Sequence, residues 1–107
     1  MAGFSTLKGS EKMKLGLCKG RHPMPVENYI FGGVVNPLDV DGLEREAVTA
    51  LLEFGKLKHI DLYVSGLTVA LIAALNACSQ LSIEVTLYHF DRDSGTYYPQ
   101  EVKNCAS

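Results

Sequence analysis

Hydrophobic and polar residues alternate most regularly near the end of the chain. The segment Ile83-Glu-Val-Thr-Leu-Tyr-His-Phe90 has the two-residue period of a β-strand. Residues 91–95 (Asp-Arg-Asp-Ser-Gly) are predicted to form a turn with Gly95 at a position that commonly needs a positive φ. Thr96 to Val102 are expected to return as an edge strand. The pattern therefore predicts a C-terminal β-hairpin at the end of a sheet.

Two segments in the middle of the chain show the spacing of α-helices. After Asn36 to Asp39, which supply a turn and an N-cap, apolar residues recur every three or four positions as far as Gly55. Those residues are Val40, Leu43, Ala47, Ala50, Leu51 and Phe54. The charges on the opposite face, which we expect to be solvated, are Glu44, Arg45, Glu46 and Glu53.

The second predicted helix, from about Leu67 to Leu81, is apolar nearly all round. It is therefore expected to be buried on more than one side. A small domain has few places to bury such a helix, so one face is predicted to contact a partner subunit. The sequence thus predicts a homodimer or a higher homo-oligomer.

Shorter apolar segments complete the predicted sheet. Lys14 to Cys18 alternates as a short strand, and Tyr29 to Val35 is a second strand or a hairpin arm, weakened by its pair of glycines. Ile60 to Val64 is the next strand. Residues 1–12 are interpreted as a flexible leader, and 13–107 as a single domain. The expected fold is α/β: a small Rossmann-like sheet with two main helices and the C-terminal hairpin.

Composition limits the classes of partner. The 107 residues carry a formal net charge of -2, so no basic field favours duplex DNA or an anionic membrane. The chain has no apolar run of membrane-spanning length and no signal-peptide pattern. Its cysteines, Cys18, Cys78 and Cys105, lack the Cys-x-x-Cys spacing of a zinc site or a redox pair. We expect a cytoplasmic protein without a membrane partner.

Candidate ligand-binding residues lie at the ends of two predicted strands. The strand to Val64 opens the second helix through a turn that offers hydroxyls, free backbone N–H groups and a positive dipole end. Carboxyl ends of neighbouring parallel strands meet at one edge, so this turn is expected to face the cationic loop after Cys18. The candidate ligand-binding residues are Lys19, Gly20, Arg21, His22, Ser65, Gly66, Leu67 and Thr68. Two cations and an imidazole opposite a helix N-terminus suit a phosphodiester. The alternative is that Ser65 or Thr68 merely caps the helix.

These motifs resemble those of a known family. Arg21-His22-Pro23 after a first strand looks like the opening of small CRISPR-associated proteins that bind cyclic oligoadenylate, some of which are ring nucleases. The turn Val64-Ser-Gly-Leu-Thr68, the Ala-rich helix to Cys78 and the strand Leu87-Tyr-His-Phe-Asp91 are similar to a βαβ unit of CARF domains. The usual CARF turn has two glycines and a Lys after the Thr, where this chain has Leu67 and Val69.

The resemblance implies a two-fold dimer that holds a cyclic or short oligonucleotide signal of antiviral defence. If the ligand is cleaved, a ribose 2′-hydroxyl would attack the adjacent phosphate without metal. His22 is then the candidate acid or base, with Lys19 and Arg21 as electrostatic partners. The competing hypothesis is sequestration without chemistry, as in small viral proteins that bind immune nucleotides. A third is a protein-interaction module with no nucleotide ligand.

Other polar and aromatic residues receive structural interpretations. Tyr29, Phe31, Tyr88 and Tyr97 can stack on bases, although packing in the core or on the sheet is the expected role of each. Asp91 and Asp93 offer too few ligands for a metal, and turn chemistry explains them. His59 and His89 are expected to be structural or at the surface. No metal and no cofactor are predicted.

Overall fold

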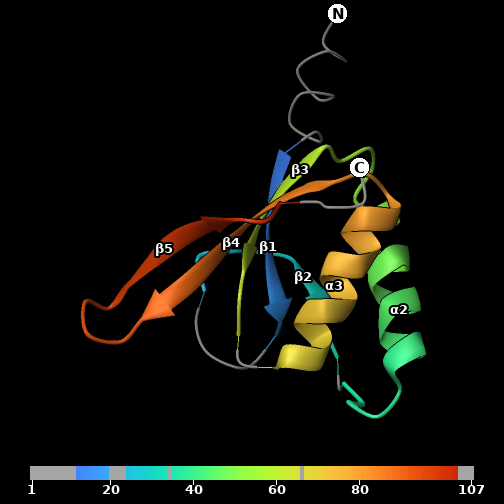
Figure 1. Cartoon of the computed structure of the whole chain (residues 1–107), viewed down its shortest axis with the longest axis horizontal. Helices are drawn as coiled ribbons and strands as arrows, with labels where there is room; N and C mark the ends of the chain where they lie inside the picture. The colour runs from blue at the N-terminus through green and yellow to red at the C-terminus, as the bar shows by residue number, and fades with distance from the viewer. Residues whose placement is uncertain (1–11, 20–23, 34, 66, 104–107) are drawn as a thin grey trace, which may run out of the picture.

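A computed structural model describes residues 12–19, 24–33, 35–65 and 67–103. The fold is α/β, as predicted: the described residues form a mixed five-stranded sheet with the order β2-β1-β3-β4-β5, and the helices α2 and α3 (Figure 1). The elements are β1 (Lys12–Cys18), β2 (Tyr29–Phe31), α2 (Val40–Glu53), β3 (His59–Tyr63), α3 (Thr68–Gln80), β4 (Glu84–Asp91) and β5 (Thr96–Glu101).

Two strands differ in length from their predictions. β1 begins at Lys12, one residue before the expected start of the domain, because Lys12 is level with His59 in the β1–β3 pair. β2 has three residues instead of seven. It stops before Gly32 and Gly33, since glycine has no side chain to pack and gains more freedom outside a strand.

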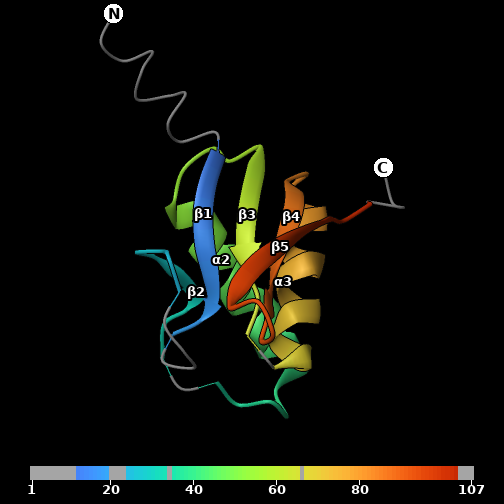
Figure 2. The ribbon, with the colours of Figure 1, turned by 90° about the vertical axis from the view of Figure 1, so that its left-hand side faces the viewer.

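The first four strands run parallel, and β5 pairs antiparallel with β4. Gly95, in the β4–β5 connection, has the expected positive φ, at 72°. Helices α2 and α3 cover one face of the sheet (Figure 1), whereas no helix formed by the described residues lies over the other face (Figure 2). The apolar side chains of β1, β3 and β4 alternate with polar ones, so the core forms between the sheet and the helices. The opposite, open face is left with the polar and aromatic side chains.

The helices follow the signals in the sequence. Asp39 is the N-cap of α2, and its side chain accepts a hydrogen bond of 3.0 Å from the Gly42 N–H. Gly55, with φ 102°, follows the end of this helix as expected. α3 packs against both the sheet and α2, which confirms that it is buried on two sides. Its buried residues are Ala70, Ala73, Ala74, Ala77 and Cys78.

Glu44 of α2 has a role beyond the solvated charge that the sequence predicts. Its side chain is partly exposed, and its carboxylate accepts exposed hydrogen bonds from the side-chain amides of Asn76, at 3.3 Å, and Gln80. These amides belong to α3, which lies beside α2. Glu44 therefore links the two helices, a role that depends on a residue pair more than thirty positions apart in the chain.

Candidate functional site

The carboxyl edge of the sheet contains the point where the chain reverses its direction of winding. From β1 the chain goes to β2 on one side and then to β3 on the other, so β1 and β3 are neighbours with the order 2-1-3-4-5. In open α/β sheets, ligands bind outside the carboxyl ends of the strands at such a switch point. Gly16 is level with Tyr63, so the chain segments after Cys18 and after Val64 start from adjacent positions, as the sequence predicted.

The structure places half of the predicted site residues. Lys19 directly follows β1, its side chain is exposed, and its backbone N–H donates to the Phe31 carbonyl at 3.0 Å. Ser65, Leu67 and Thr68 lie between β3 and the first turn of α3. Gly20, Arg21, His22 and Gly66 lie outside the described residues. The acid-base candidate His22 is thus not placed, whereas the hydroxyl turn is.

Ser65 is the unusual residue of this turn. Its side chain is 3% exposed, and Oγ has no hydrogen-bond partner among the described residues. A buried hydroxyl without a partner costs about 1–3 kcal/mol, so such groups are rare in folded proteins. Val64 still donates its N–H to the Tyr88 carbonyl at 3.0 Å, so Ser65 leaves the sheet at its edge.

The N-terminus of α3 has no side-chain cap. Leu67 occupies the N-cap position with extended backbone, and no side chain of the described residues makes a cap hydrogen bond there. The interpretation of Ser65 or Thr68 as a simple helix cap is therefore wrong. The N–H groups of the first turn have no partners within a helix, and they carry its positive dipole end. The first turn of α3 has no acidic residue to compete for these donors. Together with Ser65 and Lys19, they can bind an anionic oxygen.

Aromatic side chains lie on the open face next to this edge. Tyr63 and Tyr88 stack with centroids 4.8 Å apart, and Tyr97 meets Tyr63 edge-on at 4.9 Å. Phe90 contacts Tyr97 at 5.3 Å. We call these four residues the tyrosine face. Packing on the sheet, expected for Tyr88 and Tyr97, is confirmed; Phe31 is fully buried in the core. Tyr63 was not among the aromatic residues predicted to stack, although its alternation with Ile60 and Leu62 assigns it to the open face.

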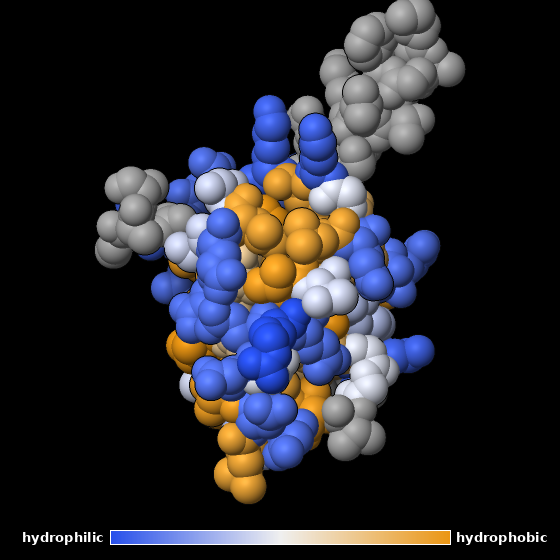
Figure 3. Space-filling view, turned by 90° about the vertical axis from the view of Figure 1, so that its right-hand side faces the viewer, coloured by the Kyte–Doolittle hydropathy of each residue, from blue (hydrophilic) through white to orange (hydrophobic). Residues whose placement is uncertain are grey.

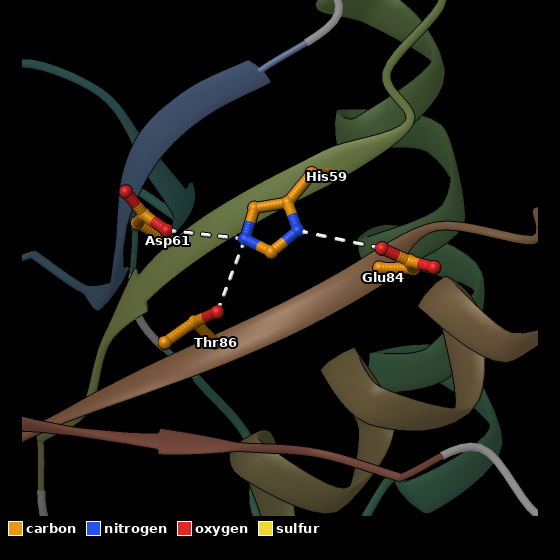
Figure 4. Close-up of polar contacts among 4 residues, drawn as sticks. All are labelled: His59, Asp61, Glu84 and Thr86. Atoms are coloured by element: carbon orange, nitrogen blue, oxygen red, sulfur yellow. Dashed lines mark hydrogen bonds and ion pairs between the residues drawn. The ribbon is translucent and has the colours of Figure 1, made fainter.

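A polar cluster occupies the same face toward the other end of the strands. His59 Nε2 lies 3.2 Å from Asp61 Oδ1 and 3.1 Å from Thr86 Oγ1, while Nδ1 lies 3.8 Å from Glu84 Oε1 (Figure 4). A carboxylate only accepts, so Nε2 must carry a proton to bind Asp61. Such a nitrogen has no lone pair for the hydroxyl of Thr86, so the cluster is not a nucleophile–base pair. The imidazole N–H thus donates a hydrogen bond to Asp61, which is only 9% exposed.

We expect His59→Leu to lower the free energy of unfolding by about 1–2 kcal/mol, because it leaves the buried Asp61 without its hydrogen-bond donor. Urea denaturation measures this loss. The double variant His59→Leu/Asp61→Leu should be less destabilised than the sum of the single variants. Strict additivity would show that the two side chains do not interact. His89, which contacts the exposed Gln100 at 2.8 Å, provides a control variant, His89→Leu, with a smaller expected effect.

Two negative findings concern the part of the chain that the structure describes. No group of three or more His, Cys, Asp or Glu side chains is placed to hold a metal ion there. Nor does that part contain a helix of the length and apolarity needed to cross a membrane. Cys18 and Cys78 are buried thiols, and burial raises the pKa of Cys78 to about 12, which disfavours the reactive thiolate.

Comparisons with protein-family models, with curated proteins and with solved structures found no match to this chain. A functional assignment therefore depends on the residues and on their geometry.

Proposed function

We propose that this protein binds a cyclic oligonucleotide, or a related nucleotide messenger of antiviral defence, at the carboxyl edge between β1 and β3. The observation that carries the proposal is the buried, unpartnered hydroxyl of Ser65 beside the uncapped N-terminus of α3, at the switch point of the sheet. A phosphate oxygen placed there accepts from Ser65 and from the first-turn N–H groups. Lys19 adds a cation at the same edge.

The strand order supports a Rossmann-like, CARF-like version of this fold. Parallel β1, β3 and β4 are joined through helices, and the proposed ligand site is at the one place where winding reverses. The Arg21-His22-Pro23 motif supplies the further sequence link to proteins that bind cyclic oligoadenylate. The proposal includes Arg21 and His22 in the site because they follow Lys19 closely in the sequence.

We further propose a homodimer. Figure 3 shows hydrophobic residues gathered in the upper part of the helical side of the molecule. Separately, the side chains of Leu52 in α2 and Ile72 in α3 are large, apolar and exposed, at 59% and 50%. Burial of such side chains against a second copy is favourable by about 25 cal/mol per Å² of apolar surface. A dimer also suits a cyclic ligand, whose repeated phosphates can meet the same donors from both subunits.

Different residues are assigned to ligand binding and to ligand cleavage. The described residues of the edge supply hydrogen-bond donors and positive charge, which bind a phosphate and stabilise charge on it. Proton transfer is assigned to His22, with the ribose 2′-hydroxyl as the nucleophile and no metal in the step. Sequestration requires only the donors, so, if the unsubstituted protein cleaves its ligand, a His22→Ala variant is expected to lose cleavage to a greater extent than binding.

The test is a melting-temperature screen with chelator present. The ligands are cyclic di-, tri-, tetra- and hexanucleotides and cyclic ADP-ribose isomers, and chromatography follows each ligand over time. A ligand at one hundred times its Kd stabilises the protein by about 2.7 kcal/mol. A shift with intact ligand indicates sequestration, and a shift with linear products indicates cleavage. If no nucleotide shifts the melting temperature, the proposed function is wrong and the protein-interaction module gains support.

A further inference from the structure

The tyrosine face has an outer surface that its own packing does not cover. Tyr63 is 7% exposed because Tyr88 stacks on it and Tyr97 meets it edge-on. Tyr88 and Tyr97 are half-buried, and Phe90 is 44% exposed. The twisted β4–β5 ribbon passes over the open side of β3, away from both helices (Figures 1 and 2). The buried ring thus supports outer rings that solvent reaches.

This surface adjoins the proposed phosphate site. Ser65 follows Tyr63 by two residues, which is about 7 Å along an extended chain. Tyr63 is level with Tyr88 on β4 and with Gly16 on β1, two residues before the end of β1. A ligand whose phosphate contacts Ser65 therefore has the tyrosine face as its nearest wall on the open side of the sheet.

The tyrosine face is neutral, unlike the polar cluster farther along the strands. The sheet positions level with Tyr63 are Tyr29, Gly16, Tyr88 and Pro99, none of which is charged. Burial is the main cause that raises the pKa of Tyr63 and of Tyr97 above the ordinary value. Their phenols are therefore neutral near pH 7. Neutral rings carry no charge to repel a phosphate, and they stack on bases of any identity.

We propose that the tyrosine face is the base-binding wall of the nucleotide site, with a base stacked on the accessible rings of Tyr88, Phe90 and Tyr97. This inference rests on the proposed function and specifies its ligand class. The site is expected to bind a nucleotide, which has an aromatic base, more tightly than a sugar phosphate, which has none. Stacking contributes five- to more than a hundredfold in affinity per base in single-stranded nucleic-acid complexes.

The neighbouring tyrosine provides a matched control. Tyr97 and Tyr98 are consecutive on β5, so their side chains point to opposite faces of the strand. Tyr97 contacts Tyr63 and Phe90, whereas Tyr98 contacts His89 and is 52% exposed. Tyr97→Leu removes a ring from the proposed wall, Tyr97→Phe keeps the ring without its hydroxyl, and Tyr98→Leu removes a ring from the other face.

The experiment measures binding of cyclic tetra-adenylate, adenosine 5′-monophosphate and ribose 5-phosphate by calorimetry. The protein has five tyrosines and no tryptophan, so quenching of tyrosine fluorescence reports ring stacking directly. We expect Tyr97→Leu to lower the affinity for both adenine ligands about tenfold and to leave the affinity for ribose 5-phosphate unchanged. Tyr97→Phe and Tyr98→Leu should bind all three as the unsubstituted protein does. Circular dichroism and thermal melting establish whether each variant is folded. If Tyr97→Leu is not folded, the test is repeated with Tyr88→Leu.

The outcomes separate the two proposals. Equal affinity of Tyr97→Leu and Tyr98→Leu for adenine ligands, or binding without tyrosine quenching, overturns the base-binding wall and leaves the phosphate site standing. Binding of ribose 5-phosphate as tight as that of adenosine 5′-monophosphate has the same meaning. If none of the three ligands binds the unsubstituted protein, the same variants are tested with the nucleotide that shifts its melting temperature. If no nucleotide shifts it, the proposed function is overturned, and the base-binding wall with it.

Discussion

Ser65→Ala is expected to raise the melting temperature of the ligand-free protein and, at the same time, to weaken nucleotide binding. The hydroxyl is buried at 3% exposure without a partner among the described residues, so its removal relieves a desolvation cost of about 1 kcal/mol. For a domain of this size, that gain corresponds to a rise of roughly 4 °C. The same hydroxyl is the proposed donor to a phosphate. Loss of a hydrogen bond to a charged group should reduce affinity by about tenfold or more.

The opposite signs of these two effects make the prediction specific. Thermal denaturation of ligand-free protein gives the first effect, and titration with the nucleotide that shifts the melting temperature gives the second. Thr49→Ala removes a hydroxyl from an exposed position of α2 and should change neither quantity by much. A fall in the melting temperature of ligand-free Ser65→Ala would instead mean that the hydroxyl makes a structural hydrogen bond. Equal affinity of Ser65→Ala and unsubstituted protein would remove Ser65 from the site.

Local signals in the sequence were sufficient for the helices and for most of the sheet. Asp39 before an amphipathic segment predicted the cap of α2, and alternation from Ile83 to Phe90 predicted β4 within one residue at each end. Each of these signals involves residues that are close in the chain. β2 was predicted too long because alternation continues through Val35, whereas the two glycines end the strand.

Features that depend on distant residues were not predictable in the same way. Glu44 gave every local sign of a solvated charge, yet its partners lie on α3. The Ser65 turn had the composition of a helix cap, but whether a hydroxyl reaches the first-turn N–H groups depends on backbone geometry at Leu67. The pairing of His59 with Asp61 and Thr86 requires the β3–β4 register. The candidate edge itself was predictable, because adjacent parallel strands must end together.

The tyrosine face depends partly on local sequence signals and partly on contacts between distant residues. Alternation within β3 and β4 places Tyr63 and Tyr88 on one face of the sheet, which a sequence can indicate. Their stacking requires that they be level in the register, and the edge-on contact of Tyr97 with Tyr63 requires the twist of the β4–β5 ribbon over β3. Because β5 is not a hydrogen-bonded neighbour of β3, no pairing rule places these two rings together.

Gly16→Val is expected to destabilise the protein by about 1–3 kcal/mol, through overpacking on the open face. The ring of Tyr29 lies directly over Gly16, so even a Cβ there would overlap the ring, and it would lie 3.0 Å from Met24 Sδ. Tyr29 must then move from its place beside Gly16, level with the tyrosine face.

Gly32→Val is the matched control, because a Cβ at Gly32 meets no atom within 4 Å. Urea denaturation should separate the two variants by most of the predicted cost, and tyrosine fluorescence of folded Gly16→Val should differ from that of the unsubstituted protein as Tyr29 is displaced. Equal stability of both variants would show that Tyr29 leaves Gly16 without cost, and that its ring is not held against the sheet. A destabilised Gly16→Val would show instead that glycine in a central strand is needed to seat an aromatic ring on the open face, beside the proposed ligand site.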